Sequence, residues 1–178
     1  MESINREQLA AMVRAATEDV FGTMLGVPVE CLPCYDSNSE CQSFDGVIAL
    51  VGLAGTWTGA GQISCSSVLA CRLSGALLAS EYAAVNEDVL DAMSEITNMI
   101  IGNVKSSLED RLGPMGLSIP TVIFGRNYQA RSSGVSQWTV APFRCDTESF
   151  EVRIALVPNT KAECVRGASH APELHEVC

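Results

Sequence analysis

Apolar residues recur every three to four positions in three segments of the chain, which is the spacing of an amphipathic helix. The first segment opens with Asn5 and Gln8, which resemble a capping box, and ends at Gly26. The second covers 67–79 and the third 86–113. The positions expected to face the core are Leu9, Met12, Ala16, Val20, Met24, Leu69, Leu73, Ala76, Leu77, Val89, Met93, Ile96, Ile100 and Val104. We therefore predict three helices.

Shorter apolar runs between turn signals predict strands over 27–32, 46–53, 56–64, 117–124, 135–143 and 149–157. The second and third runs are separated by Ala54 and Gly55, which favours a hairpin. The polar segment 35–45 has no hydrophobic period and is expected to be a loop. From Pro158 onward the composition turns polar, so we expect a folded domain over 1–157 and a tail over 158–178.

The order of these elements is a helix and three strands, then two helices and three strands. Strands that follow one another in runs are typical of an α+β fold with an antiparallel sheet, rather than of a doubly wound one. The repeated order also suggests a duplication, in which Glu18 aligns with Glu95. We therefore expect duplicated α-β-β-β units whose six strands form a mainly antiparallel sheet covered by the long helices.

The chain of 178 residues carries 21 acidic and 11 basic side chains, for a formal charge of −10. Nucleic-acid binding requires clustered Lys and Arg, which this composition lacks. The longest apolar run, 47–54, is far shorter than the roughly 20 residues that span a membrane, and the N-terminus lacks the pattern of a signal peptide. We expect a cytoplasmic protein that binds neither nucleic acid nor membrane.

The eight cysteines fit a reducing compartment, in which thiols stay unpaired. Cys31 and Cys34 form a CxxC pair, which can hold zinc or cycle as a dithiol; Cys41 lies nearby, and His170 and His175 stand in the tail. No second CxxC follows at zinc-finger spacing. Free structural thiols are therefore favoured and no metal site of its own is expected, with a zinc or thiol protein kept as an alternative.

Polar residues of the third predicted helix share a stripe about 80° wide at 100° per residue: Asp91, Glu95, Asn98, Gly102, Lys105 and Glu109. Such stripes are usually solvated faces. However, glycine in a helix interior costs about 1 kcal/mol relative to alanine, and asparagine is a poor helix former on an exposed face. Gly102 and Asn98 therefore favour a surface against which a partner docks.

The pattern Asp91-x3-Glu95-x2-Asn98, followed 22 residues later by Pro120, resembles the signature of the CheX/CheC/FliY chemotaxis phosphatases, and the chain is most similar to the CheX members. Other segments that agree are Asn98-Met-Ile-Ile-Gly102-Asn103, Ile119-Pro120, Phe21-Gly-Thr-Met-Leu-Gly26 and Gly55-x3-Gly59-x-Gly61. The resemblance covers residues 5–157 and implies a CheC-like fold.

The resemblance further implies a hydrolase acting on the phospho-aspartate of a CheY-like response regulator. Asn98 would orient the attacking water, Glu95 would pair with the regulator's lysine, and Asp91 and Gly102 would contact the partner, while Pro120 is expected to be structural. An acyl phosphate is already activated, so its hydrolysis needs a positioned water more than a strong base. No cofactor of its own is implied, and Mg²⁺ is expected in the partner receiver domain.

The first unit keeps only part of this signature, since Arg14 stands at the position of Asp91 and Phe21 at that of Asn98. Some members of the family carry two sites, and we expect one here. CheX-like proteins are typically homodimers, which implies a homodimer for this chain. The alternative function is a non-catalytic module of the same fold that binds a receiver domain or builds a switch complex.

Overall fold

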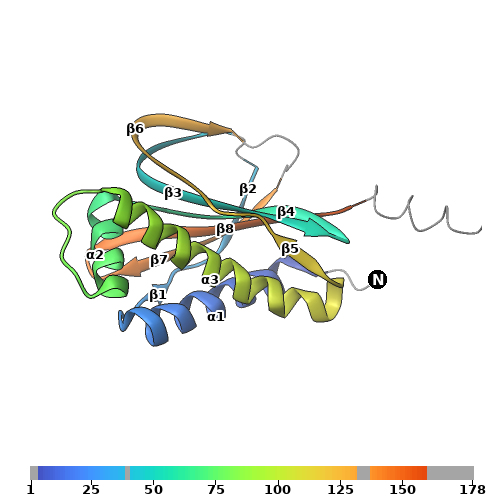
Figure 1. Cartoon of the computed structure of the whole chain (residues 1–178). Coiled ribbons are helices and arrows are strands. Elements are labelled where there is room, and N and C mark those ends of the chain that lie inside the picture. The colour runs from blue at the N-terminus through green and yellow to red at the C-terminus, as the bar shows by residue number, and fades with distance from the viewer. Residues whose placement is uncertain (1–3, 39–40, 132–136, 160–178) are drawn as a thin grey trace, which may run out of the picture.

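The computed structural model describes residues 4–38, 41–131 and 137–159. Within them, helices lie on one face of an antiparallel sheet (Figure 1). The helices are α1 (Arg6–Val20), continued by the π-helical turn η1 (Phe21–Leu25), α2 (Ser67–Leu78) and α3 (Glu87–Leu112). The strands are β1 (Glu30–Cys31), β2 (Tyr35–Ser37), β3 (Cys41–Gly55), β4 (Trp57–Cys65), β5 (Met115–Leu117), β6 (Thr121–Arg131), β7 (Trp138–Cys145) and β8 (Glu148–Pro158). The predicted α+β class is confirmed.

The strand order shows the predicted duplication. The sheet runs β1-β7-β8-β4-β3-β5, with β2 also pairing with β7 and β6 with β3. Exchanging β1 with β5, β2 with β6, β7 with β3 and β8 with β4 leaves this order unchanged. The same exchange relates α1 to α3, which pack against each other beneath the sheet (Figure 1). The two units therefore meet at the central β4–β8 pair.

Eight strands are described where six were predicted, because the first strand of each unit is divided in two. Pro33 lies between β1 and β2, and Pro120 lies between β5 and β6. Proline has no N–H to donate to a strand ladder, so it marks a natural break in pairing. The predicted strand over 27–32 is correspondingly reduced to β1, and the short β5 overlaps the strand predicted over 117–124 only at residue 117.

The predicted loop over 35–45 is wrong. β2 begins at Tyr35, and β3 begins at Cys41, well before the first apolar residue of the predicted strand. β3 pairs with β6 from Leu50 opposite Thr121 to Cys41 opposite Arg131, with a bulge between Phe44 and Gly46. Backbone hydrogen bonds to a long partner strand extend β3 here, and they need no alternation of apolar side chains.

Helix α1 changes its period at its end. Its capping box is confirmed, since the Asn5 side chain accepts from the Gln8 N–H at 2.9 Å and the Asn5 N–H donates to Gln8 Oε1 at 3.2 Å. The π-turn η1 then widens the helix before Gly26 ends it at φ +63°. A wider turn rotates the following residues, which buries Leu25 and leaves Met24 52% exposed. The prediction that Met24 faces the core is therefore wrong, and so is the one for Ala76 of α2, which is exposed.

Helix α3 lies at the centre of the core. Asn86 caps it by accepting from the Val89 N–H at 3.0 Å, and the apolar stripe predicted from Val89 to Val104 is buried. Against β4, Ile101 packs over Gly61, where an added Cβ would lie 2.5 Å from Ile101 Cδ1. The absence of a side chain at Gly61 therefore sets how closely α3 approaches the sheet.

None of the described helices combines the length and apolarity needed to cross a bilayer. Most of the predicted tail, 160–178, lies outside the described residues, and with it His170 and His175.

We predict that Gly61→Ala lowers the free energy of unfolding by about 1–3 kcal/mol, because its methyl group overlaps the Ile101 side chain and forces α3 away from β4. Urea denaturation measures the change. Gly102→Ala is the matched control, since its Cβ would meet Leu117 Cδ1 at an ordinary 3.7 Å and alanine is the better helix former by about 1 kcal/mol. Equal effects of the two substitutions would contradict this account of the packing.

Candidate functional site

The residues of the predicted motif share the solvent-facing flank of α3. Asp91 and Glu95 are exposed, whereas Asn98 is half-buried at the margin of the core. The neighbouring Thr97 is fully buried, and its hydroxyl donates to the Met93 carbonyl at 2.7 Å. Asn98 is thus displayed from a helix turn that is anchored on its inner side.

The polar stripe divides into two halves with different roles. Toward the C-terminus, Lys105 Nζ lies 2.8 Å from Glu109 Oε2, and Glu109 Oε1 accepts from the Met115 N–H at 2.9 Å. These two bonds lower the pKa of Glu109 and attach the end of α3 to β5. The side chains of Lys105 and Glu109 therefore stabilise the fold itself.

The N-terminal half of the stripe consists of Asp91, Glu95 and Asn98. Asp91, Glu95 and Asn98 make no side-chain hydrogen bond or ion pair with any residue in the described part of the chain. Along 73–104 the sequence contains no Lys or Arg, so α3 itself offers this half no cation. The arrangement leaves a carboxylate and a carboxamide, one helical turn apart, free for a partner.

Gly102 follows Asn98 by one turn and is half-buried beside β5. An added Cβ would meet Leu117 Cδ1 at 3.7 Å, which is ordinary contact. The described residues therefore give no packing reason for a glycine at this position, unlike Gly61.

Pro120 lies in the link that joins β5 to β6. Ser118 fixes this link to β3, because its N–H donates to the Gly52 carbonyl at 2.9 Å and its hydroxyl accepts from the Gly52 N–H at 2.8 Å. Next to it, Ile119 is 90% exposed. The link thus places an exposed apolar residue at the same edge of the sheet as Leu117, which Gly102 faces.

The family described as "Chemotaxis phosphatase CheX" matches residues 47–144, which is more than half of the chain and includes Asp91, Glu95 and Asn98. This chain belongs to the CheX family. No curated protein sequence matches it significantly.

Solved structures of chemotaxis and related proteins share the fold. The chemotaxis protein CheX from Desulfovibrio desulfuricans is 24% identical with a TM-score of 0.75, and the match covers 84% of this chain and 99% of that one. A chain of the CheX-CheY-BeF3-Mg²⁺ complex from Borrelia burgdorferi is 25% identical with a TM-score of 0.69, covering 86% and 99%. FliY from Thermotoga maritima, at 15% identity, has a TM-score of 0.61 over 87% of this chain and 92% of its own.

The first unit of this CheX-family chain presents different groups at the motif positions. Arg14 Nε bonds Glu18 Oε1 at 2.8 Å, so the glutamate is already paired. Phe21, at the position of Asn98, is 1% exposed and stacks on Phe150 with ring centroids 4.9 Å apart, while Phe143 stacks on Phe150 at 5.2 Å. At this position the first unit has the buried aromatic ring of Phe21, whereas the second unit has the half-buried carboxamide of Asn98.

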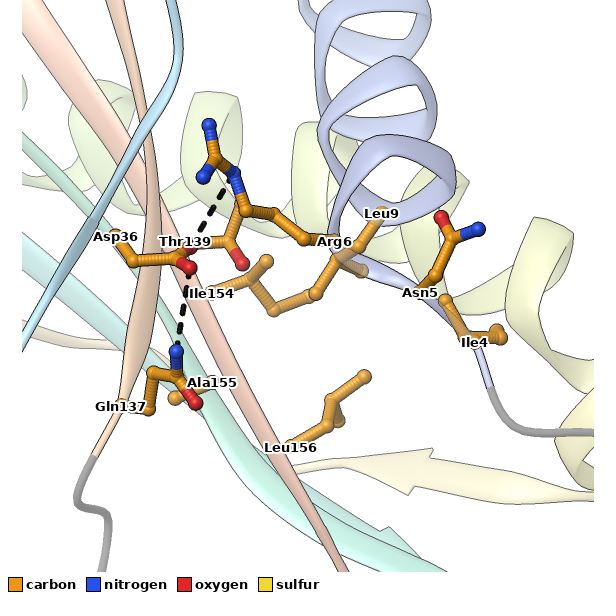
Figure 2. A pocket seen from close by; sticks show the side chains of 10 residues that line it. All are labelled: Ile4, Asn5, Arg6, Leu9, Asp36, Gln137, Thr139, Ile154, Ala155 and Leu156. Carbon is orange, nitrogen blue, oxygen red and sulfur yellow. Dashed lines mark hydrogen bonds and ion pairs between the residues drawn. The ribbon is translucent and has the colours of Figure 1, made fainter.

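A polar recess lies between the start of α1 and strands β7 and β8 (Figure 2). Arg6 and Gln137 both reach Asp36 there, at 3.6 Å from Arg6 Nε to Asp36 Oδ1 and 3.2 Å from Gln137 Nε2 to Asp36 Oδ2. Its charges are therefore paired within the chain, and the residues that line it do not belong to the motif face of α3.

A second groove, missed by the sequence prediction, borders the start of α3. It lies between α2, residues 82–85 and β6, with Val68 59% and Phe124 48% exposed and Arg126 at its rim. Val68 does not share the helix face of Leu69 and Leu73, which indicates that its side chain points away from the core. The exposure of Phe124 had no such signal, because Phe124 ends a continuous apolar run, 122–124, in which the two faces of the strand do not alternate in polarity.

No three His, Cys, Asp or Glu side chains of the described residues come together as a metal site. The cysteines at 31, 34, 65, 71 and 145 are free thiols.

We predict that Phe21→Asn, which restores the motif asparagine to the first unit of this CheX-family protein, lowers the free energy of unfolding by about 3–5 kcal/mol, because it removes a buried stacked ring. Urea denaturation measures the loss. Met24→Asn in the same π-turn is the control, and since Met24 is 52% exposed its effect should stay within about 0.5 kcal/mol. A Phe21→Asn protein as stable as the native one would show that this ring is dispensable.

Proposed function

We propose that this protein hydrolyses the phospho-aspartate of a CheY-like response regulator, with Asn98 orienting the attacking water and Glu95 binding the regulator's active-site lysine. The observation that carries the proposal is the unengaged Glu95–Asn98 pair on the anchored helix of a CheX-family chain. The Borrelia complex, which contains both CheX and CheY, supports this class of partner.

A carboxamide suits the proposed reaction. The acyl phosphate is already reactive, so the main contribution required is a water held in line with the phosphorus. The Asn98 amide can accept a hydrogen bond from that water and donate one to a phosphoryl oxygen, and it carries no charge to repel the phosphoryl group. The buried neighbours Ile96, Thr97 and Ile100 hold the backbone of this turn against the core, which reduces the entropy lost on docking.

The charge near the motif indicates which protein holds the phosphate. Glu81, Glu87, Asp88, Asp91 and Glu95 are all exposed, and the next cation along the helix, Lys105, is paired with Glu109. Such a face repels a free phosphate ester, so the lysine and the Mg²⁺ that stabilise the phosphoryl charge come from the receiver domain in this proposal. A Glu95–lysine pair would then orient the two proteins.

Asp91 and Gly102 mark the two ends of the proposed contact, separated by about 16 Å along the helix axis. In this proposal Asp91 adds a second carboxylate for the partner, and Gly102 allows the partner's backbone to approach α3. The nearest described atom to an added Cβ at Gly102 is Leu117 Cδ1 at 3.7 Å, so no described residue overlaps the space that this glycine leaves. The expected homodimer remains a prediction.

We predict that Asn98→Ala lowers kcat/KM by at least about 100-fold, the usual loss when a positioning group is removed, without lowering the thermal stability. The assay phosphorylates a cognate receiver domain with a small phosphodonor and Mg²⁺ and follows the decay. Asn103→Ala is the matched control, because Asn103 is exposed on the same helix and turned about 140° away from Asn98.

Each outcome of that assay is informative. If the native protein leaves the decay unchanged but binds the phosphorylated receiver, the non-catalytic module replaces the enzyme. If Asn98→Ala retains full acceleration while the native protein is active, the assignment of the water-positioning residue is wrong.

We predict that Glu95→Gln weakens binding of the phosphorylated receiver about tenfold and flattens its dependence on ionic strength, since it removes one charge from the proposed ion pair. Titration calorimetry at two salt concentrations measures both. Asp110→Asn removes an exposed charge near the other end of α3 and should leave the affinity unchanged. An unaltered salt dependence in Glu95→Gln would exclude the ion pair.

A further inference from the structure

Cys31 and Cys34 line a groove on the flank of α1 that carries the altered motif of the first unit. Cys31 ends β1, and Cys34 immediately precedes β2. Ala10, Ala11 and Arg14 of α1 form the opposite wall, and the groove has a volume of about 440 Å³. Both cysteines are half-buried, whereas the other described cysteines, at 65, 71 and 145, are buried. Cys31 and Cys34 are therefore more exposed than the thiols at 65, 71 and 145, and both line this one groove.

The two thiols lie on the same side of their loop. Cys31 Sγ donates to the Leu32 carbonyl at 3.4 Å, and Cys34 Sγ reaches the same oxygen at 3.9 Å. Burial raises the pKa of the Cys31 thiol to about 11, and the adjacent Cys34 thiol adds to the rise. Two sulfurs that share one acceptor and influence each other's ionisation are close neighbours.

The loop that holds them is fixed on both sides. The Leu32 N–H donates to the Pro142 carbonyl at 2.8 Å, which ties the loop to β7. From α1, Arg6 Nη2 donates to the Cys34 carbonyl at 3.2 Å. The loop is therefore a clamped segment that holds both sulfurs beside the Leu32 carbonyl.

We propose that Cys31 and Cys34 are a reactive dithiol that a low-molecular-weight disulfide converts to an intrachain disulfide. In the first step the Cys34 thiolate attacks one sulfur of the external disulfide, whose S–S bond breaks and releases one thiolate. In the second step the Cys31 thiolate attacks the Cys34 sulfur of this mixed disulfide and releases the other. Two protein thiols are oxidised, one external disulfide is reduced to two thiols, and these carry away the two protons.

Cys34 is assigned the first attack because a thiol with a raised pKa is rarely ionised near neutral pH, and Cys31 is such a thiol. Cys31 then acts within the mixed disulfide, where its closeness to Cys34 gives it a high effective concentration. The positive charge of Arg14 opposes the rise in the pKa of Cys31 more strongly than the carboxylate of its partner Glu18 adds to it, so this ion pair favours the Cys31 thiolate at that step. This assignment does not rest on the proposed phosphatase function.

The test exposes the full chain, with Cys41, Cys164 and Cys178 replaced by serine, to oxidised glutathione at graded ratios to the reduced form. Acid quenching, alkylation and peptide mass mapping then locate the oxidised thiols. We expect loss of the mass of two hydrogens and a Cys31–Cys34 cross-link. The unsubstituted chain, mapped in the same way, is expected to contain the same cross-link.

Single variants separate the two steps. Cys31→Ser should stop at a glutathionyl mixed disulfide on Cys34, whereas Cys34→Ser should lose most of the reaction. Cys71→Ser, which removes a buried thiol, should still form the cross-link. The proposal is overturned if fully oxidised glutathione leaves both thiols reduced, if both carry glutathione without closing, or if the cross-link joins other cysteines.

Discussion

The packing of α3 on β3 and β4 determines most of what this chain presents to solvent. The helix approaches β4 closely because Gly61 leaves room for Ile101, and its buried stripe then fixes its rotation about its own axis. With the rotation set, Asp91, Glu95 and Asn98 have to lie on the outer flank. A candidate site made of three side chains on one helix depends on this contact more than on any bond of its own.

The two units of the duplicated fold use equivalent positions for different purposes, the first for stability and the second for recognition. At equivalent positions, the first unit places Phe21 in a stack with Phe150 and Phe143, and the second places Asn98 at the surface. A buried ring stabilises the fold, whereas a free amide on a half-exposed turn contributes little stability and suits recognition. The paired Arg14 and Glu18 complete the change of the first unit from a polar face to a structural one.

The sequence predicted the parts of the fold that depend on local physics. The capping box at Asn5, the buried stripe of α3 and the duplication follow from capping chemistry and from the 3.6-residue period, and the structure confirms them. The start of β3 at Cys41 and the exposure of Met24 depend instead on a distant partner strand and on a π-turn, neither of which leaves a periodic signal.

The same distinction applies to the candidate site. Which residues of α3 share a face could be predicted, but which of them are free could not, because Lys105 and Glu109 are engaged by each other and by Met115 of β5.

The N-terminal half of the stripe on α3 contains no positively charged side chain, and this limits the mechanisms that it can support. A phosphatase acting alone needs positive charge to stabilise the phosphoryl oxygens. This face instead displays acidic side chains, and the next cation along α3, Lys105, is paired with Glu109. Under the proposed function, the receiver domain brings the phosphate together with the charges that bind it, and this chain adds a positioned amide and an orienting carboxylate. Its acidity then favours docking on a lysine-bearing partner and disfavours binding of free phosphate esters, so selectivity for the phosphorylated protein follows from the charge of the face.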